Sequence, residues 1–144
     1  MLSCWHKSGR SWRKVSLTKN IFDRNSTYYE GGAIRVRDSA TITGNTFSNN
    51  SGCCSSGGAV RARNGAIITG NTFSNNSNDS GGALWVEYSA AISNNSFSGN
   101  SAANHGGAIQ IYGSNTITGN RAAVYGGGLY LENAAHKTSV GQDP

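Results

Sequence analysis

Short apolar segments alternate with polar residues along most of the chain. The apolar side chains occupy every second position in pieces of three to five residues, such as Ile34 and Val36, Val60 and Ala62, Leu84 and Val86, and Ile109 and Ile111. Gly, Asn and Ser separate these pieces. A period of two in short pieces between turn residues is typical of strands, because an amphipathic helix needs a run of about ten residues or more. The pattern therefore predicts an all-β chain.

The strand pattern belongs to a repeat that begins at a double glycine. Its first glycines are 26, 24, 25 and 20 residues apart, at Gly31, Gly57, Gly81, Gly106 and Gly126. In four units an isoleucine lies eleven residues after that glycine, at Ile42, Ile68, Ile92 and Ile117. Units of about 25 residues bury little alone but share a continuous core when stacked. The sequence therefore predicts a right-handed parallel β-helix of about four coils, with three short strands per coil.

The repeat divides the chain into three parts. Residues 1–14 are basic, and we expect a disordered tail there. Residues 15–135 hold the β-helix, with coils starting at 31, 57, 81, 106 and 126, and residues 136–144 form a C-terminal tail. A stack of about four coils leaves sheet edges open at both ends. We therefore expect a segment of a longer solenoid, or a chain that needs further coils or a partner as caps.

Equivalent residues of the units should form columns along the stack. Glycines at the coil corner permit a positive φ, at Gly31, Gly57, Gly81 and Gly106. Phenylalanines five residues after the isoleucines predict an inner aromatic column, formed by Phe47, Phe73 and Phe97. Asparagines recur at one turn (Asn45, Asn71, Asn95 and Asn120) and at another (Asn50, Asn76 and Asn100). Because stacked strands lie about 4.8 Å apart, these asparagines can form amide ladders.

The paired motifs of this repeat resemble those of a known family. GGA followed by Ile, Val or Leu, together with Phe-x-x-Asn, is similar to the repeats of chlamydial polymorphic outer membrane proteins. The GGA motifs begin at Gly31, Gly57, Gly81 and Gly106, whereas Gly126 departs because Gly128 replaces the alanine. The resemblance covers residues 22–132. It implies a right-handed β-helix, a cell-surface or outer-membrane location and an autotransporter-like, structural or adhesive role.

The composition adds constraints on compartment and partners. The chain of 144 residues has 20 glycines, one proline, 13% charged residues and a net charge of +5. Residues 1–14 lack the apolar stretch of a secretory signal, and no segment has the roughly 20 apolar residues of a membrane span. Three cysteines, Cys4, Cys53 and Cys54, are too few for a disulfide framework and fit an incidental thiol or a vicinal disulfide. We expect no nucleic-acid partner.

The ionisable residues do not predict a catalytic or metal site. Hydrolysis or lyase chemistry on a polysaccharide needs clustered carboxylates. Glu87 and Glu132 share an outward column, but they are two coils, about 10 Å, apart, and Tyr112 lies between them. We therefore expect a non-enzyme without cofactor or metal. The alternative is a polysaccharide lyase-like or hydrolase-like β-helix whose catalytic coils are missing.

Two outward strand faces are candidate binding surfaces. On the first strand, alternation places Arg35, Arg61, Trp85, Gln110 and Tyr130 in one outward column, and Arg37, Arg63, Glu87, Tyr112 and Glu132 in the next. Arginine beside Trp and Tyr suits an anionic glycan, whereas the simpler alternative is a solvated face with a surface pair between Arg63 and Glu87. On the second strand, Thr41, Thr43, Thr116 and Thr118 lead to a minor alternative, an ice-binding protein.

Overall fold

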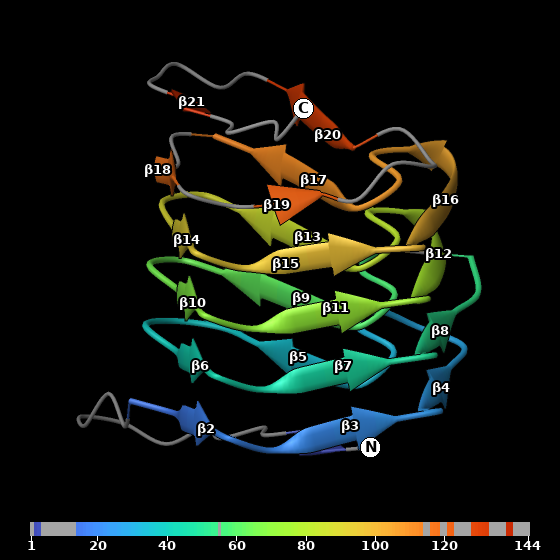
Figure 1. Cartoon of the computed structure of the whole chain (residues 1–144), viewed down its shortest axis with the longest axis horizontal. Helices are drawn as coiled ribbons and strands as arrows, with labels where there is room; N and C mark the ends of the chain where they lie inside the picture. Colours follow the sequence, from blue (N-terminus) through green and yellow to red (C-terminus); the bar gives the residue numbers. More distant parts are fainter. Residues whose placement is uncertain are drawn as a thin grey trace.

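The protein is a stack of parallel strands (Figure 1). The computed structural model describes residues 2–3, 14–54, 56–113, 116–118, 121–122, 128–132 and 138–139. The strands nearest the two chain ends are described by their backbone alone. Strands, turns and bends make up this described part, which has no helix.

Four parallel sheets run along the stack, each taking one strand from successive coils. Sheet A contains, in spatial order, β1 (Leu2–Ser3), β5 (Ile34–Val36), β9 (Val60–Arg63), β13 (Leu84–Glu87), β17 (Ile109–Tyr112) and β20 (Leu129–Glu132). Sheet B contains β2 (Ser16–Thr18), β6 (Thr41–Thr43), β10 (Ile67–Thr69), β14 (Ala91–Ser93), β18 (Thr116–Thr118) and β21 (Thr138–Ser139).

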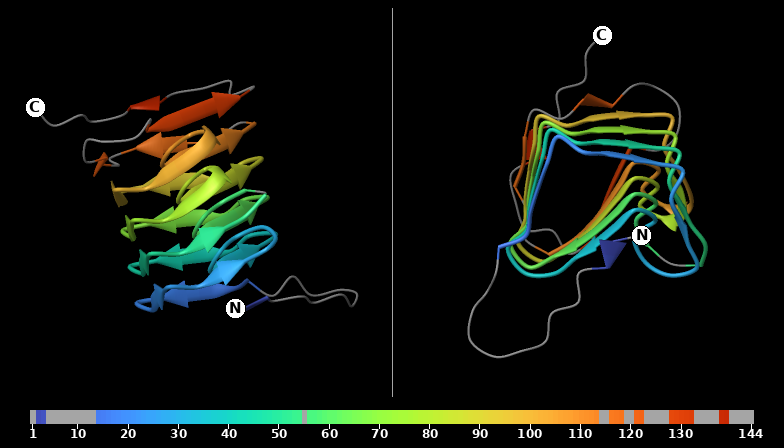
Figure 2. Two further views of the ribbon diagram at one scale, coloured as in Figure 1. Left: turned by 90° about the vertical axis from the view of Figure 1, so that its right-hand side faces the viewer. Right: turned by 90° about the horizontal axis from the view of Figure 1, so that it is seen from below.

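The other two sheets follow in each coil. Sheet C contains β3 (Ile21–Asp23), β7 (Thr46–Ser48), β11 (Thr72–Ser74), β15 (Ser96–Ser98) and β19 (Arg121–Ala122). Sheet D contains β4 (Ser26–Thr27), β8 (Ser51–Gly52), β12 (Ser77–Ser80) and β16 (Ser101–His105). Seen along the stack, the coils superpose around a triangular interior (Figure 2).

The register places equivalent residues directly over one another, as the repeat predicts. Ile68 pairs with Ile42 on one side and with Ile92 on the other, and Phe73 pairs with Phe47 and Phe97. Consecutive Phe rings from Phe22 to Phe97 stack with centroids 4.8–4.9 Å apart and nearly parallel planes. Sheets A, B and C all contribute side chains to this one core.

Buried asparagines hold two of the corners together. Asn71 Oδ1 accepts from the backbone N–H and the Nδ2 of Asn45 at 2.9 and 3.0 Å. Asn71 Nδ2 in turn donates to Asn95 Oδ1 at 2.9 Å and to the backbone oxygen of Ile42 at 2.8 Å. The second column repeats this arrangement from Asn25 through Asn50 and Asn76 to Asn100. The predicted amide ladders are thus confirmed among the described residues, whereas Asn120 lies outside them.

The two glycines of each double-glycine corner have different roles. The first glycine has a positive φ, for example 68° at Gly31 and 76° at Gly57. The second lies so close to the next coil that a Cβ on Gly58 would be 1.9 Å from the backbone oxygen of Gly82. The first position needs both a positive φ and room for a nearby backbone oxygen, which a Cβ on Gly31 would meet at 2.2 Å, and close approach of two coils explains the second.

Sheet D gives the middle coils a fourth strand, whereas the sequence predicts three strands per coil. Its residues are mostly Ser and Asn without alternating apolar side chains, so the sequence pattern indicates turns there. Backbone pairing between successive coils, such as Ser77 with Ser101, is what makes these segments strands. Sheet D follows sheet C in each coil and precedes the double glycine that opens sheet A.

Most of the two predicted tails lies outside the described residues, as does Gly126. Leu2–Ser3 nevertheless pairs with Ile34 and Arg35 at the edge of sheet A. Thr138–Ser139 pairs with Ile117 and Thr118 in sheet B. An open parallel edge offers backbone groups to any sequence, which explains pairing outside the repeat.

Candidate functional site

Sheet A brings the predicted ligand-face residues into two columns. Arg35 pairs in register with Arg61, Arg61 with Trp85, Trp85 with Gln110, and Gln110 with Tyr130. In the neighbouring column, Arg63 pairs with Glu87, Glu87 with Tyr112, and Tyr112 with Glu132. The predicted columns are therefore confirmed at the level of the backbone register. The side chains of Tyr130 and Glu132 lie outside the described part.

The prediction that the first column is a solvated face is wrong for its middle residues. Arg61 is 4% exposed, Trp85 6% and Gln110 1%. For Arg61, the physical reason is the chain segment between sheets C and A, which bulges outward at one corner of the triangle (Figure 2). Glu30, which lies in this segment, reaches both Arg35 and Arg61. Alternation identifies the side of a strand to which a residue points, but not what covers that side.

An ion-pair network joins β5, β9 and β13 of sheet A. Glu30 pairs with Arg35 at 2.6 Å and also with Arg61. Arg61 lies 3.4 Å from Glu87, and its guanidinium carbon stacks 4.0 Å from the centre of the Trp85 ring. The predicted pair between Arg63 and Glu87 is confirmed, but it is partly buried, since the two side chains are 30% and 14% exposed.

Burial and mutual repulsion both act on the arginines. Burial, with a further contribution from the charge of Arg63, lowers the pKa of Arg61 to about 10. The pKa of Arg63 is lowered by burial first and then by the charges of Arg37 and Arg35. The pKa of Arg35 is lowered by burial and by Arg37. All three remain cationic at neutral pH, and each is destabilised by its neighbours' charges.

The charges of this cluster do not cancel. Arg35, Arg61, Arg63 and Arg37 supply four positive charges, whereas Glu30 and Glu87 supply two negative ones. Arg61 pairs with both carboxylates and stacks on the Trp85 ring. Arg35, Arg37 and Arg63 are partly or fully exposed. We call these three residues the basic edge; solvent reaches them, as it does the half-buried Tyr112 of the predicted ligand face.

Comparison with protein-family models identifies the fold. A model described as a right handed beta helix region matches residues 6–143, nearly the whole chain. The chain belongs to the right-handed β-helix family. No curated protein and no solved structure matches it. The right-handed β-helix is found in adhesins and in pectin lyase-like enzymes, so membership alone does not separate these two roles.

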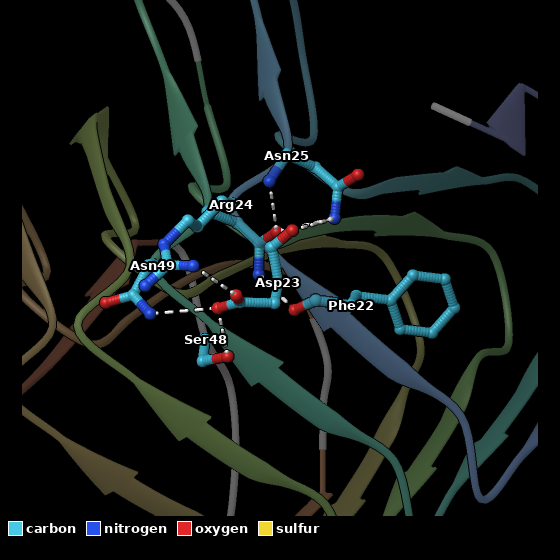
Figure 3. A network of polar contacts seen from close by, with 7 residues as sticks. Phe22, Asp23, Arg24, Asn25, Ser48 and Asn49 are labelled. Carbon is cyan, nitrogen blue, oxygen red and sulfur yellow. Dashed lines mark hydrogen bonds and ion pairs between the residues drawn. The ribbon is translucent and has the colours of Figure 1, made fainter.

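The carboxylates of this β-helix are mostly engaged with neighbouring side chains. At the corner between sheets C and D, Asp23 accepts from Ser48 Oγ at 2.6 Å and from Asn49 Nδ2 at 2.9 Å (Figure 3). These two bonds, with Arg24 nearby, hold the pKa of Asp23 below its ordinary value of 3.8. Asp38 accepts from Asn64 Nδ2 at 2.8 Å. Within the described residues, no three His, Cys, Asp or Glu side chains could together hold a metal ion.

One of the two outward columns of sheet B has no hydroxyl in the middle of the stack, whereas Thr43, Thr69, Ser93 and Thr118 continue the other. Thr41 and Thr43 are half-buried, and Ile67 is the exposed residue in register with Thr41. Ala91 continues that column, and the side chain of Thr116 is outside the described part. A continuous flat array of threonines therefore does not form over these coils.

Sequence reasoning missed Glu30, which proves central to the site. It lies in an irregular loop, three residues after Thr27 and directly before Gly31, where no repeat position marks it. Its position between two buried or half-buried arginines is set by the path of the loop. The described residues also include no helix long and apolar enough to cross a bilayer.

Proposed function

We propose that this β-helix is a non-catalytic scaffold of an adhesin-like surface protein, structural or adhesive, whose basic edge binds an anionic polysaccharide. The single observation that carries the proposal is the gathering of arginines at one end of sheet A. Three accessible or half-accessible arginines lie beside each other there, and their mutual repulsion is relieved only in part by Glu30 and Glu87.

The chemistry of the basic edge favours carboxylate or sulfate groups on a repeating chain. Guanidinium groups donate in a planar fork that matches such oxyanions, often with two hydrogen bonds. Arg37 and Arg63 are adjacent in one column because Asp38 N–H donates to Arg63 O at 3.2 Å. Neighbouring coils therefore present cations at the strand spacing of about 4.8 Å. An anion between them would reduce the repulsion that lowers the pKa of Arg63.

We do not expect Arg61 and Trp85 to contact the polysaccharide, because both side chains are buried. They support the basic edge from beneath instead, because Arg61 pairs with Glu30 and Glu87 and stacks on Trp85. This network fixes the carboxylates that orient Arg35 and Arg63. Arg35, Arg37 and Arg63 are the residues that we expect to touch the polysaccharide.

The test compares two double variants of equal charge change on heparin and on neutral dextran. Arg35→Gln/Arg37→Gln removes two charges from the basic edge, whereas Lys19→Gln/Arg24→Gln removes two exposed charges from the far corners of the first coil. Wild type should bind heparin in a salt-dependent manner and should not bind dextran. The basic-edge variant should lose most of this affinity, and the control should keep it. Equal losses in the two variants, or no heparin binding by wild type, would contradict the proposal.

A further inference from the structure

The loop between β8 and the second double glycine contains two cysteines joined to each other. Cys53 and Cys54 are adjacent in sequence, form a disulfide and are both exposed. Cys54 has a φ of 68°, in the left-handed region that residues other than glycine rarely adopt.

This loop is longer than its counterpart in the next coil. Gly57 follows Asn50 by seven positions, whereas Gly81 follows Asn76 by only five. Ser51 pairs with Ser77, and Ser56 forms an isolated bridge with Ser80, whereas the described residues 52–54 between them have no strand partner in the next coil. The two cysteines thus lie in a bulge of sheet D.

The bulge is attached to the first coil on both sides of the disulfide. Cys53 N–H donates to Thr27 O, and Ser56 O accepts from Gly31 N–H, each at 3.1 Å. None of the isoleucine, phenylalanine or asparagine columns passes through the bulge. Opening the ring would therefore free the bulge while the core of the stack stays in place.

We propose that Cys53–Cys54 is a thiol–disulfide exchange site that reacts in the folded protein, and that its opening releases the bulge without unfolding the coils. An external thiolate attacks one of the two sulfurs, the S–S bond breaks, and the other cysteine leaves as a thiolate and takes up a proton. A second thiol of the same dithiol then displaces the remaining cysteine. Two electrons pass to the protein, and the dithiol becomes a disulfide.

The exposure of both cysteines supports this reactivity. Exchange needs access of the attacking thiolate to a sulfur atom, and exposed disulfides are the labile ones, whereas buried structural disulfides resist reduction. The co-reactant is a dithiol or the cysteine of a partner protein. The proposal is independent of polysaccharide binding, because the basic edge lies on sheet A and the bulge on sheet D.

The first test treats the folded protein with graded dithiothreitol and then iodoacetamide, followed by trypsin. Cleavage after Arg37 and Arg61 releases one peptide, residues 38–61, that carries both cysteines, while Cys4 lies on residues 1–7. We expect no label on peptide 38–61 before reduction and two carbamidomethyl groups after it, with circular dichroism unchanged. Label before reduction, label only in urea, or a cross-link to peptide 1–7 would overturn the proposal.

The second test uses single-cysteine variants and amide exchange. Cys53→Ser leaves one thiol at this site, which should form a mixed disulfide with oxidised glutathione on peptide 38–61, whereas Cys53→Ser/Cys54→Ser should not. After reduction of wild type, the amides of Gly31 and Cys53 should exchange faster, and the amides of Asn45 and Asn71 should not change. Faster exchange at all four amides would mean that the coils unfold, and no change at Gly31 and Cys53 would mean that the bulge is not released; either result overturns the proposal.

Discussion

Replacing Asn71 by alanine tests the contribution of the asparagine ladder to stability. The Asn71 side chain is 1% exposed and makes five hydrogen bonds: two accepted from Asn45, and three donated to Ile42 O, Thr69 O and Asn95 Oδ1. Alanine leaves the buried N–H of Asn45 without an acceptor, because Asn71 Oδ1 is its partner.

The magnitude follows from these contacts. An orphaned buried donor costs about 1–3 kcal/mol, and each further lost hydrogen bond has a net value of about 0.5–1.5 kcal/mol. Some of the other partners keep a second bond; Asn45 Nδ2, for example, also donates to Leu17 O and Thr43 O. Counting the orphaned amide and two lost bonds, we expect Asn71→Ala to lower the free energy of unfolding by about 2–6 kcal/mol.

The assay is urea unfolding followed by circular dichroism at neutral pH, with Ser74→Ala as the matched control. Ser74 lies three residues away on the half-buried outer side of β11, so its replacement should change stability by less than about 0.5 kcal/mol. If Asn71→Ala unfolds within about 0.5 kcal/mol of wild type, the ladder does not stabilise the stack and this reasoning is refuted.

Three further predictions follow from the same contacts. Gly44→Ala should cost about 1–2 kcal/mol because φ is 65° although the added Cβ has room, whereas Gly58→Ala should prevent folding because its Cβ would meet Gly82 O at 1.9 Å; thermal melting that ranks them the other way contradicts the distinction between a positive φ and a close approach of two coils. Arg61→Ala should lower the free energy of unfolding by about 3–5 kcal/mol, because it removes one cation from between Glu30 and Glu87. Arg61→Met should lower it less than Arg61→Ala, because the longer side chain can still pack on Trp85. Equal urea midpoints for the two variants would argue against that packing. The pKa of Asp23 is lower in the folded protein than its ordinary value of 3.8. Its stabilising contribution is therefore present above that value and is lost as pH falls through the folded pKa. Asp23→Asn should remove this part of the acid sensitivity, and an unchanged profile of stability against pH would contradict the prediction.

The register of the stack could be predicted because the repeat encodes it at every coil. One isoleucine, one phenylalanine and two asparagines recur at fixed offsets, and a shift by one residue would turn every apolar side chain outward. The confirmed pairing of Ile42, Ile68 and Ile92 therefore follows from spacing alone. The amide ladders follow from the same spacing, because equal side chains in adjacent coils lie within hydrogen-bond reach.

The path of the chain between sheets C and A could not be predicted from the same pattern. This segment varies in length and is rich in Ser and Asn, so neither its strands nor its bend carries an apolar signal. Its path nevertheless brings Glu30 onto Arg35 and Arg61. This tertiary contact helps to bury Arg61 and covers part of Arg35 in the basic edge. A lone acidic residue directly before a double glycine is the only local clue.

Nuclear Overhauser effects between phenylalanine rings test the stacked register most directly. The chain has four phenylalanines, and the structure places all four in one column, with consecutive centroids 4.8–4.9 Å apart. In protein labelled at phenylalanine and assigned with single Phe→Leu variants, we expect contacts between the rings of Phe22 and Phe47, of Phe47 and Phe73, and of Phe73 and Phe97. Rings two coils apart should show none. Missing contacts between consecutive rings, or contacts that skip a coil, would contradict the parallel stack.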